Sequence, residues 1–281
     1  MIYGNTVLIT GASSGIGKNI AQALANKGYR VYGTSRKPVP KSSSNIRNFE
    51  DKKGFIEMVQ LDVRSEESIR KAIDYIVKKE GKIDILINNA GVGIAGAIED
   101  TTAEEAYKQF DTNFFGVLRM CRNVIPIMRK KSKKNKPSLI INISSVAGLI
   151  SIPFQAMYSA SKYALEAMSE ALRIELKPFG INVVLVEPGD TNTRFTANRR
   201  LVVEANENSV YKERFTKSLT TMEKDETNGP APETVSNVIL KIVNRKNPPV
   251  RVTVGFNYKM IVFLKRLVPA RLLEYVVSKL Y

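Results

Sequence analysis

The stretch that decides the fold is TVLITGASSGIGKNIAQALANKG, residues 6–28. A β-rich run, Thr6 to Thr10, leads into a helical pattern that begins at Gly15 and continues to Lys27. The loop between them has the spacing GxxxGxG and carries three glycines: Gly11, Gly15 and Gly17. Amides at the start of a helix bind phosphate, and glycine lets the chain turn tightly and approach it closely. The stretch therefore predicts a site for a dinucleotide pyrophosphate, with a plain strand–helix turn as the alternative.

The alternation of strand and helix continues along the chain. Further strand-like runs are 29–35, 55–63, 83–88, 138–144, 182–187 and 250–255, and helical patterns are 66–79, 103–128, 157–178 and 233–244. Apolar strands separated by helices of this length predict parallel βαβ units with helices on both faces. We expect an α/β fold: a single doubly wound Rossmann-type domain with a parallel sheet of about seven strands. We place it at 1–255, with a polar loop at 36–54 and a substrate loop at about 190–229.

Composition excludes several kinds of chemistry. The 281 residues contain no histidine, so His-based metal sites and Ser-His or Cys-His nucleophiles are excluded, and no metal is expected. Cys121 is the single cysteine, so no intrachain disulfide can form. No leader-like segment and no apolar run long enough to cross a bilayer is recognised, which predicts a cytoplasmic protein, with peripheral membrane contact as an alternative.

The net charge of +16 favours the binding of an anionic partner. Residues 129–136, RKKSKKNK, carry six of the positive charges, and we interpret them as a solvated loop between a helix and the strand at 138–144. Contact with an anionic membrane or with nucleic acid is the alternative for this loop. No aromatic residue interleaves the lysines and no nucleic-acid-binding motif is present, so no nucleic acid is expected as a partner.

The residues after the second strand indicate the cofactor. This segment reads GTSRKP, residues 33–38, and places Arg36 where many NAD-binding proteins carry a carboxylate for the ribose 2′-hydroxyl. An arginine can pair with a 2′-phosphate that a carboxylate would repel. Arg36, supported by Lys37, therefore favours NADP(H), with a solvated basic loop as the alternative.

A second constellation lies in MYSASKYALEAM, residues 157–168. Tyr158 and Lys162 are one helical turn apart and share a face. A nearby ammonium favours a phenolate, so we expect Lys162 to lower the pKa of Tyr158 from about 10 toward the range of a proton donor or acceptor. Ser145, thirteen residues earlier, ends the strand SLIINIS and could bind a carbonyl oxygen. The alternative to such a site is that Tyr158 and Lys162 simply lie on a solvated helix face.

With these motifs the sequence resembles the short-chain dehydrogenases/reductases, including members similar to hydroxysteroid and retinol dehydrogenases. The resemblance covers residues 5 to about 195 and is carried by ordered motifs: TGASSGIG (10–17), LDV (61–63), NNAG (88–91), TNFFG (112–116), NISS (142–145), YSASK (158–162) and EPGDTNT (187–193). It implies a carbonyl–alcohol oxidoreductase in which Tyr158 transfers the proton, Lys162 tunes it and holds the ribose, and Ser145 orients the substrate. Asn113 would hold a water behind Lys162, and Asn88 would bridge strands.

The resemblance also implies which residues contact the cofactor. The set is Gly11, Ser13, Ser14, Gly15, Ile16, Gly17, Arg36, Asp62, Val63, Asn89, Ala90, Gly91, Tyr158, Lys162, Pro188, Gly189, Thr191 and Thr193. Ser14 stands where some NADP(H)-dependent members carry a basic residue, so the cofactor prediction rests on Arg36. Ser145 and Tyr158 would also contact the substrate.

The remaining segments leave alternatives open. Apolar residues in 93–98 and 146–157 predict an apolar substrate such as a steroid, retinoid or lipid. The extension 256–281 mixes apolar and basic residues and is divided by Pro269; it can pack on its own domain, join a homo-oligomer as dimer or tetramer, cover the substrate or lie on a membrane. A non-catalytic NADP(H)-binding regulator is the alternative to the enzyme, although a regulator would not need Asn113, Ser145, Tyr158 and Lys162 together.

Overall fold

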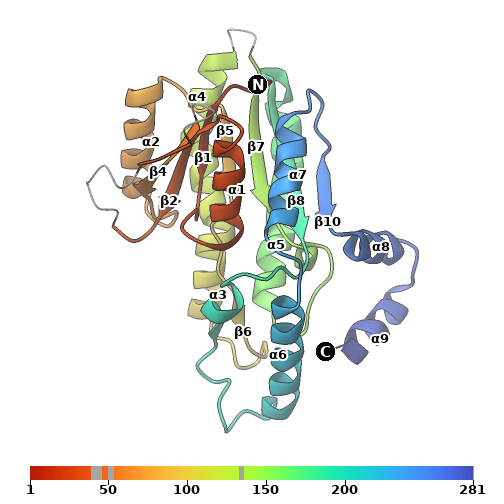
Figure 1. Cartoon of the computed structure of the whole chain (residues 1–281). Coiled ribbons are helices and arrows are strands. Elements are labelled where there is room, and N and C mark those ends of the chain that lie inside the picture. Colours follow the sequence, from red (N-terminus) through yellow and green to blue (C-terminus); the bar gives the residue numbers. More distant parts are fainter. Residues whose placement is uncertain (39–45, 50–53, 133–135, 281) are drawn as a thin grey trace.

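Among the residues that the computed structural model describes (1–38, 46–49, 54–132 and 136–280), eight strands form one sheet (Figure 1). Its order is β10–β8–β7–β5–β1–β2–β4–β3. The strands are β1 (Thr6–Ile9), β2 (Arg30–Ser35), β3 (Ile46–Phe49), β4 (Gly54–Gln60), β5 (Ile85–Asn88), β7 (Ser138–Ile143), β8 (Ile181–Pro188) and β10 (Arg251–Val254). Seven are parallel, as predicted, and β3 pairs antiparallel with β4 at one edge. The order reverses between β1 and β5, where ligands bind in folds of this type.

Helices cover both faces of the sheet. On one face lie α1 (Gly15–Ala25) and α7 (Glu233–Val243); on the other lie α2 (Glu66–Glu80), α4 (Gly116–Ser132) and α5 (Ala156–Leu176). Strand side chains alternate between these layers, so Val7 and Ile9 join the first core and Leu8 joins the second. Every residue of β1, β5 and β7 is buried, which explains the near-continuous apolar runs in the sequence.

The second core contains the only cysteine of the chain. Cys121 on α4 is 3% exposed, and burial raises the pKa of its thiol to about 12. Its sulfur accepts a hydrogen bond from Asn88, whose amide also donates to Asn142 at 2.8 Å across β5 and β7. Asn88 therefore bridges strands, as predicted.

Two expectations about loops were wrong. The polar run 36–54 contains β3, because an edge strand needs pairing on one side only and its sequence need not be apolar. The basic run 129–136 begins inside a helix, because α4 continues to Ser132. Residues 39–45 and 50–53 of the first run and 133–135 of the second lie outside the described part of the chain.

The predicted substrate loop, 190–229, has its own structure at the carboxyl edge of the sheet. It contains a 3-10 turn, Thr196–Asn198, then β9 (Arg200–Leu201) and α6 (Lys212–Thr227). β9 pairs with the short β6 (Ile94–Ala95), and α6 stands beyond the ends of the strands (Figure 1). A helical stretch, α3 (Ala103–Phe110), precedes a π-helical turn at Asp111–Phe115 that leads into α4.

The chain beyond β10 forms an arm at the side of the domain. It consists of α8 (Phe256–Lys265) and α9 (Ala270–Leu280), neither of which has a buried residue (Figure 1). None of the helices in the described ranges is both long and apolar enough to cross a membrane.

Candidate active site

A glycine cradle forms where β1 meets α1. Gly11 and Gly15 have φ of 68° and 53°, in the left-handed region that favours glycine. A Cβ on Gly11 would lie 2.9 Å from the Cα of Ala90, and one on Gly17 would lie 2.4 Å from the carbonyl oxygen of Gly11. No side chain caps the first amides of α1, and the neighbouring Ser14 is exposed. This open helix start with a close-packed glycine floor fits a dinucleotide pyrophosphate.

The segment after β5 is fastened to this cradle. The side-chain amide of Asn89 donates to the carbonyl oxygens of Thr10 and Gly11, both at 3.0 Å. The Thr10 hydroxyl accepts from the backbone N–H groups of Asn89 and Ala90, at 2.9 and 3.0 Å. From the other side, Thr193 lies 3.4 Å from where a Cβ on Gly15 would be. The structure thus brings three of the predicted cofactor segments together.

The second predicted group of cofactor residues lies at the end of β2 and after β4. Arg36 is exposed, and Asp62 is held by Arg64, whose Nη2 donates to its carboxylate at 2.7 Å. The hydrogen bond from Arg64 holds the pKa of the Asp62 carboxyl below its usual range, and the charge of Arg36 adds to this. Arg64 was missed from the sequence, although it directly follows the LDV motif. Val63 is buried against Gly116, so its side chain belongs to the core.

Asn113 sits on the π-helical turn and is 1% exposed. Its side chain exchanges two hydrogen bonds with the backbone of Val92, at 2.9 and 3.1 Å, and donates to the hydroxyl of Ser161 at 3.2 Å. Single π turns inside helices are frequent at functional sites because they re-aim one side chain. Asn113 therefore fastens the chain after Gly91 to the helix that carries Tyr158.

Ser145, Tyr158 and Lys162 come together at the carboxyl ends of β7 and β8. Ser145 follows β7, and its hydroxyl donates to the carbonyl oxygen of Pro188 at 3.4 Å. The Lys162 ammonium donates to the carbonyl oxygen of Ile143 at 2.9 Å and lies 5.7 Å from the centre of the Tyr158 ring. The structure therefore brings these three predicted side chains together.

The electrostatics of Tyr158 differ from our expectation. Burial raises the pKa of its hydroxyl to about 12; Glu226 and Asp190 add to the rise, and Ser145 and Arg199 oppose it. Burial also lowers the pKa of the Lys162 ammonium to about 8. Desolvation therefore decides the direction of the shift, and Lys162 is not among the side chains that shift this pKa. Tyr158 is neutral near pH 7 and holds a proton that it can donate.

The loop after β8 is held by the arm. The Tyr258 hydroxyl of α8 donates to the Asp190 carboxylate at 2.6 Å, and the Tyr258 ring would lie 2.3 Å from a Cβ on Gly189. Pro188 ends β8, and the hydroxyl of Thr191 donates to the carbonyl oxygen of Gly189 at 3.1 Å. No sequence pattern pointed to Tyr258, which is 68 residues away from Asp190.

A buried charge cluster lies behind Lys162. Glu166 is one helical turn further along α5 and 5% exposed, and Glu187 on β8 is fully buried. Arg251 lies 3.5 Å from Glu166 and 3.7 Å from Glu187, and it also binds the half-exposed Glu170. Burial raises the pKa of the Glu166 carboxyl to about 7 and also raises that of Glu187. The sequence alone does not show this cluster, because its members come together only where α5, β8 and β10 are in contact.

Aromatic side chains pack against Tyr158 and against α6. The ring of Phe195 lies 5.6 Å from the Tyr158 ring and packs on Gly93. Phe154 adopts a left-handed φ of 60°, which is strained for a bulky residue, and its ring packs on Phe215 of α6 at 5.6 Å. The Phe195 ring therefore gives Tyr158 an apolar neighbour.

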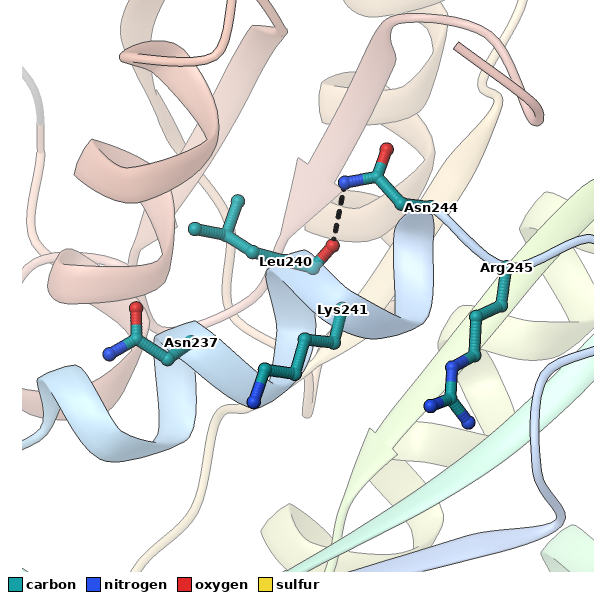
Figure 2. Close-up of a pocket in the computed structure, with 5 residues that line it drawn as sticks. All are labelled: Asn237, Leu240, Lys241, Asn244 and Arg245. Carbon is teal, nitrogen blue, oxygen red and sulfur yellow. Dashed lines mark hydrogen bonds between the residues drawn. The ribbon is translucent and has the colours of Figure 1, made fainter.

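A shallow hollow on the outer side of α7 is separate from this site. It is lined by Asn237, Leu240, Lys241, Asn244 and Arg245 (Figure 2). None of the predicted site residues lines it. In the described ranges, no group of three or more acidic or cysteine side chains could hold a metal ion.

Comparisons with known proteins agree with this geometry. Residues 5–203 match the model of the short chain dehydrogenase family. The chain belongs to this family. It is 50% identical over 249 residues to a 3-ketodihydrosphingosine reductase of Bacteroides thetaiotaomicron, covering 89% of this chain and 87% of that protein. It is 33% identical over 276 residues to retinol dehydrogenase 8 of Bos taurus, covering 94% and 86%.

Solved structures share the fold over nearly the whole chain. A short-chain dehydrogenase from Streptomyces avermitilis is 30% identical, with a TM-score of 0.78 over 99% of this chain and 95% of that one. ElxO with NADP bound is 26% identical, with a TM-score of 0.70 and coverage of 91% and 99%. A 3-ketoacyl-(acyl-carrier-protein) reductase from Brucella melitensis, complexed with NADH, is 25% identical, with a TM-score of 0.71 and coverage of 90% and 97%. This short-chain dehydrogenase is therefore an oxidoreductase with solved relatives that bind NADH or NADP.

Proposed function

We propose that this oxidoreductase uses NADP(H) to interconvert a carbonyl and a secondary alcohol on an apolar, lipid-like substrate, and that it works as a reductase. The observation that carries the proposal is the neutral hydroxyl of Tyr158, a residue whose pKa Ser145 influences and whose ring packs against Phe195 at the carboxyl edge of the sheet. The glycine cradle and the loop from Pro188 to Thr193 would hold the two ends of the cofactor. When bound, the cofactor supplies the hydride.

The chain supplies the proton and the geometry. The Tyr158 hydroxyl donates its proton to the carbonyl oxygen, and hydride at the carbon completes the alcohol. The Ser145 hydroxyl donates a hydrogen bond to the same oxygen and so stabilises the charge that develops there. Lys162, anchored on Ile143, keeps a positive charge beside the phenolate that remains.

The test is consumption of NADPH by the purified protein with a panel of ketones that includes long-chain acyl, steroid and retinoid carbonyl compounds. Tyr158→Phe should lower turnover by about 100-fold or more while NADPH binding, measured by fluorescence, persists. Tyr107→Phe is the matched control, because that tyrosine is 58% exposed on α3. Near-normal turnover in Tyr158→Phe would refute the mechanism. Tight NADPH binding without turnover of any ketone would favour the non-catalytic regulator instead.

Within the lipid-like class we propose a long-chain ketone of the 3-ketodihydrosphingosine type. Support comes from the 50% identity to the reductase of that name and from the aromatic cover of Tyr158. In the ketone panel, such a substrate should give the highest kcat/KM. A steroid or retinoid that exceeds it would move the proposal to that class.

We propose NADPH rather than NADH as the working cofactor. Arg36 and Arg64 lie near Asp62, where their guanidinium groups can pair with a 2′-phosphate. Arg36→Asp should reduce the ratio of kcat/KM for NADPH over NADH by at least tenfold. Lys27→Asp, an exposed change just beyond the C-terminal end of α1, serves as the control for charge. An unchanged ratio in Arg36→Asp would contradict this preference.

We also propose that 256–281 is an extension that binds an anionic bilayer. Its apolar side chains are exposed, among them Phe263 at 57% and Leu267 at 66%. The same segment carries five basic residues and one acidic residue, which complements anionic lipid rather than an apolar partner. Lys265 donates to the carbonyl oxygen of Leu149, four residues after Ser145, so the arm joins the site directly.

Flotation with vesicles tests the extension. The protein should float with phosphatidylserine-containing vesicles and several-fold less with phosphatidylcholine alone. The double change Phe263→Ser and Leu267→Ser should abolish flotation without loss of NADPH binding. Equal recovery of the two proteins would remove the membrane proposal.

Finally, we propose a homo-oligomer. The outer side of α4 and α5 exposes apolar side chains such as Leu118 at 37% and Ile174 at 75%. Sedimentation equilibrium should give a dimer or tetramer, and Ile174→Glu should weaken it. A monomer at micromolar concentration would contradict the proposal.

A further inference from the structure

A buried ion pair lies inside the substrate segment. The side chain of Arg199 is 2% exposed and that of Glu226 is 12% exposed. The Nη2 of Arg199 donates to one carboxylate oxygen of Glu226, and the hydroxyl of Thr196 donates to the other at 2.5 Å. The pair therefore ties the 3-10 turn to α6, two elements that stand over the active site.

The pair leaves hydrogen-bond donors unused. Among the described residues, the Nε and Nη1 atoms of Arg199 are buried and have no acceptor. A buried donor without an acceptor costs about 1–3 kcal/mol, and more for a charged group. A purely structural role would be served as well by an apolar pair of similar size. The unused donors therefore point to an acceptor on a ligand.

The pair is close to the reacting hydroxyl. The Arg199 guanidinium lies 6.0 Å from the ring centre of Phe195, which in turn lies 5.6 Å from the ring of Tyr158. The charges of Arg199 and Glu226 both act on the Tyr158 hydroxyl, as does the charge of Asp190. Asp190 belongs to the loop after β8 that leads into the 3-10 turn, and the Tyr258 hydroxyl fixes its carboxylate at 2.6 Å. Its charge and those of the pair act on one another, so we group the three side chains as one cluster.

The balance of charge indicates the ligand. The cluster holds one cation, Arg199, and two carboxylates, Asp190 and Glu226. Burial raises the pKa of both carboxyls, which means that ionising them costs free energy in the absence of a further cation. A ligand that completes this cluster offers an oxygen acceptor to Arg199 and a positive charge to the carboxylates. An anionic head group would instead meet an excess of negative charge.

We propose that Arg199, Glu226 and Asp190 form a polar subsite for an amino-alcohol head group next to the ketone. A hydroxyl oxygen accepts from the free Arg199 donors, and a protonated amine faces the two carboxylates. The aromatic residues around Tyr158 then receive the hydrocarbon part of the substrate. This inference rests on the proposed reductase function and specifies its substrate: a long-chain ketone with a neighbouring amine and hydroxyl.

The test compares three ketones of equal chain length: one with the amine and the hydroxyl, one with the hydroxyl alone, and one with neither. Wild-type kcat/KM should fall at least tenfold when the amine is removed and further when the hydroxyl is removed. Arg199→Met should reduce the discrimination for the hydroxyl at least tenfold, and Glu226→Gln should reduce the discrimination for the amine. Arg200→Met is the matched control, because Arg200 is the adjacent arginine and is exposed; it should keep both ratios.

The outcomes separate the subsite from the reductase function. If wild type reduces all three ketones equally well, or if Arg199→Met and Arg200→Met change the ratios alike, the subsite is refuted while the reductase stands. If wild type reduces none of them despite binding NADPH, the proposed function fails first. Thermal unfolding of each variant shows whether a loss of activity reflects loss of the fold, and the ratios of a folded variant decide the question.

Discussion

The carboxyl of Glu166 should control how the stability of this short-chain dehydrogenase depends on pH. Burial raises its pKa to about 7 from an ordinary value of 4.5, with Glu187 adding to the rise and Ser144 and Arg251 opposing it. The folded chain therefore keeps a proton that the unfolded chain loses. The stability linked to that proton is fully present below pH 4.5 and is lost as the pH rises through 7. Each pKa unit corresponds to about 1.4 kcal/mol, so the loss is about 3 kcal/mol.

Urea unfolding at pH 5 and pH 8.5 measures this effect. Relative to wild type, Glu166→Gln should gain roughly 2–3 kcal/mol of unfolding free energy between the two pH values, because glutamine cannot ionise. The comparison across pH cancels any fixed cost of the substitution. Glu170→Gln is the control: it contacts the same Arg251 but is half exposed, so solvent screens its charge. Parallel pH curves for Glu166→Gln and wild type would refute the reasoning.

Three further results are expected. Gly189→Ala should weaken NADPH binding at least tenfold, because its Cβ would lie 2.3 Å from the Tyr258 ring; a dissociation constant within twofold of wild type would contradict this. Gly81→Ala, at the C-cap of α2, is the control for backbone strain alone, because Gly81 has a φ of 68° and a Cβ there would meet no atom within 4 Å. Reduction should be flat up to about pH 7.5 and fall as the pH rises through about 8, because Lys162 loses its proton there; a flat kcat profile up to pH 10 would exclude this assignment. Ser145→Ala should lower kcat by about 10- to 100-fold with little change in NADPH affinity, measured by steady-state kinetics and fluorescence titration.

The sequence predicted those parts of the molecule that depend on residues close to one another in the chain. The glycine cradle and the pair Tyr158 and Lys162 lie within one turn or one helix, and each parallel strand is an apolar run of its own. The edge strand β3 was missed because its pairing with β4, rather than its composition, defines it. The exact ends of strands depend on neighbours in the same way.

The charged partners of the site were missed for a different reason. Arg199 and Glu226 are 27 residues apart, and Asp190 and Tyr258 are 68 apart, so no spacing rule connects them. The direction of the Tyr158 pKa was wrong because the sequence shows the nearby lysine but does not show how completely the site is desolvated. Both failures concern quantities that exist only after the chain has folded.

The buried thiol of Cys121 can be used to detect opening of the second core. With 3% exposure and a pKa of about 12, this sulfur should not react with maleimides or disulfide reagents until the second core opens. The rate at which Cys121 is labelled would therefore measure how often the second core opens, without any engineered probe. Since the chain has no other cysteine, a thiol introduced on α9 would be the sole fast-reacting position. A spin label or fluorophore there could follow the arm on and off a bilayer during turnover.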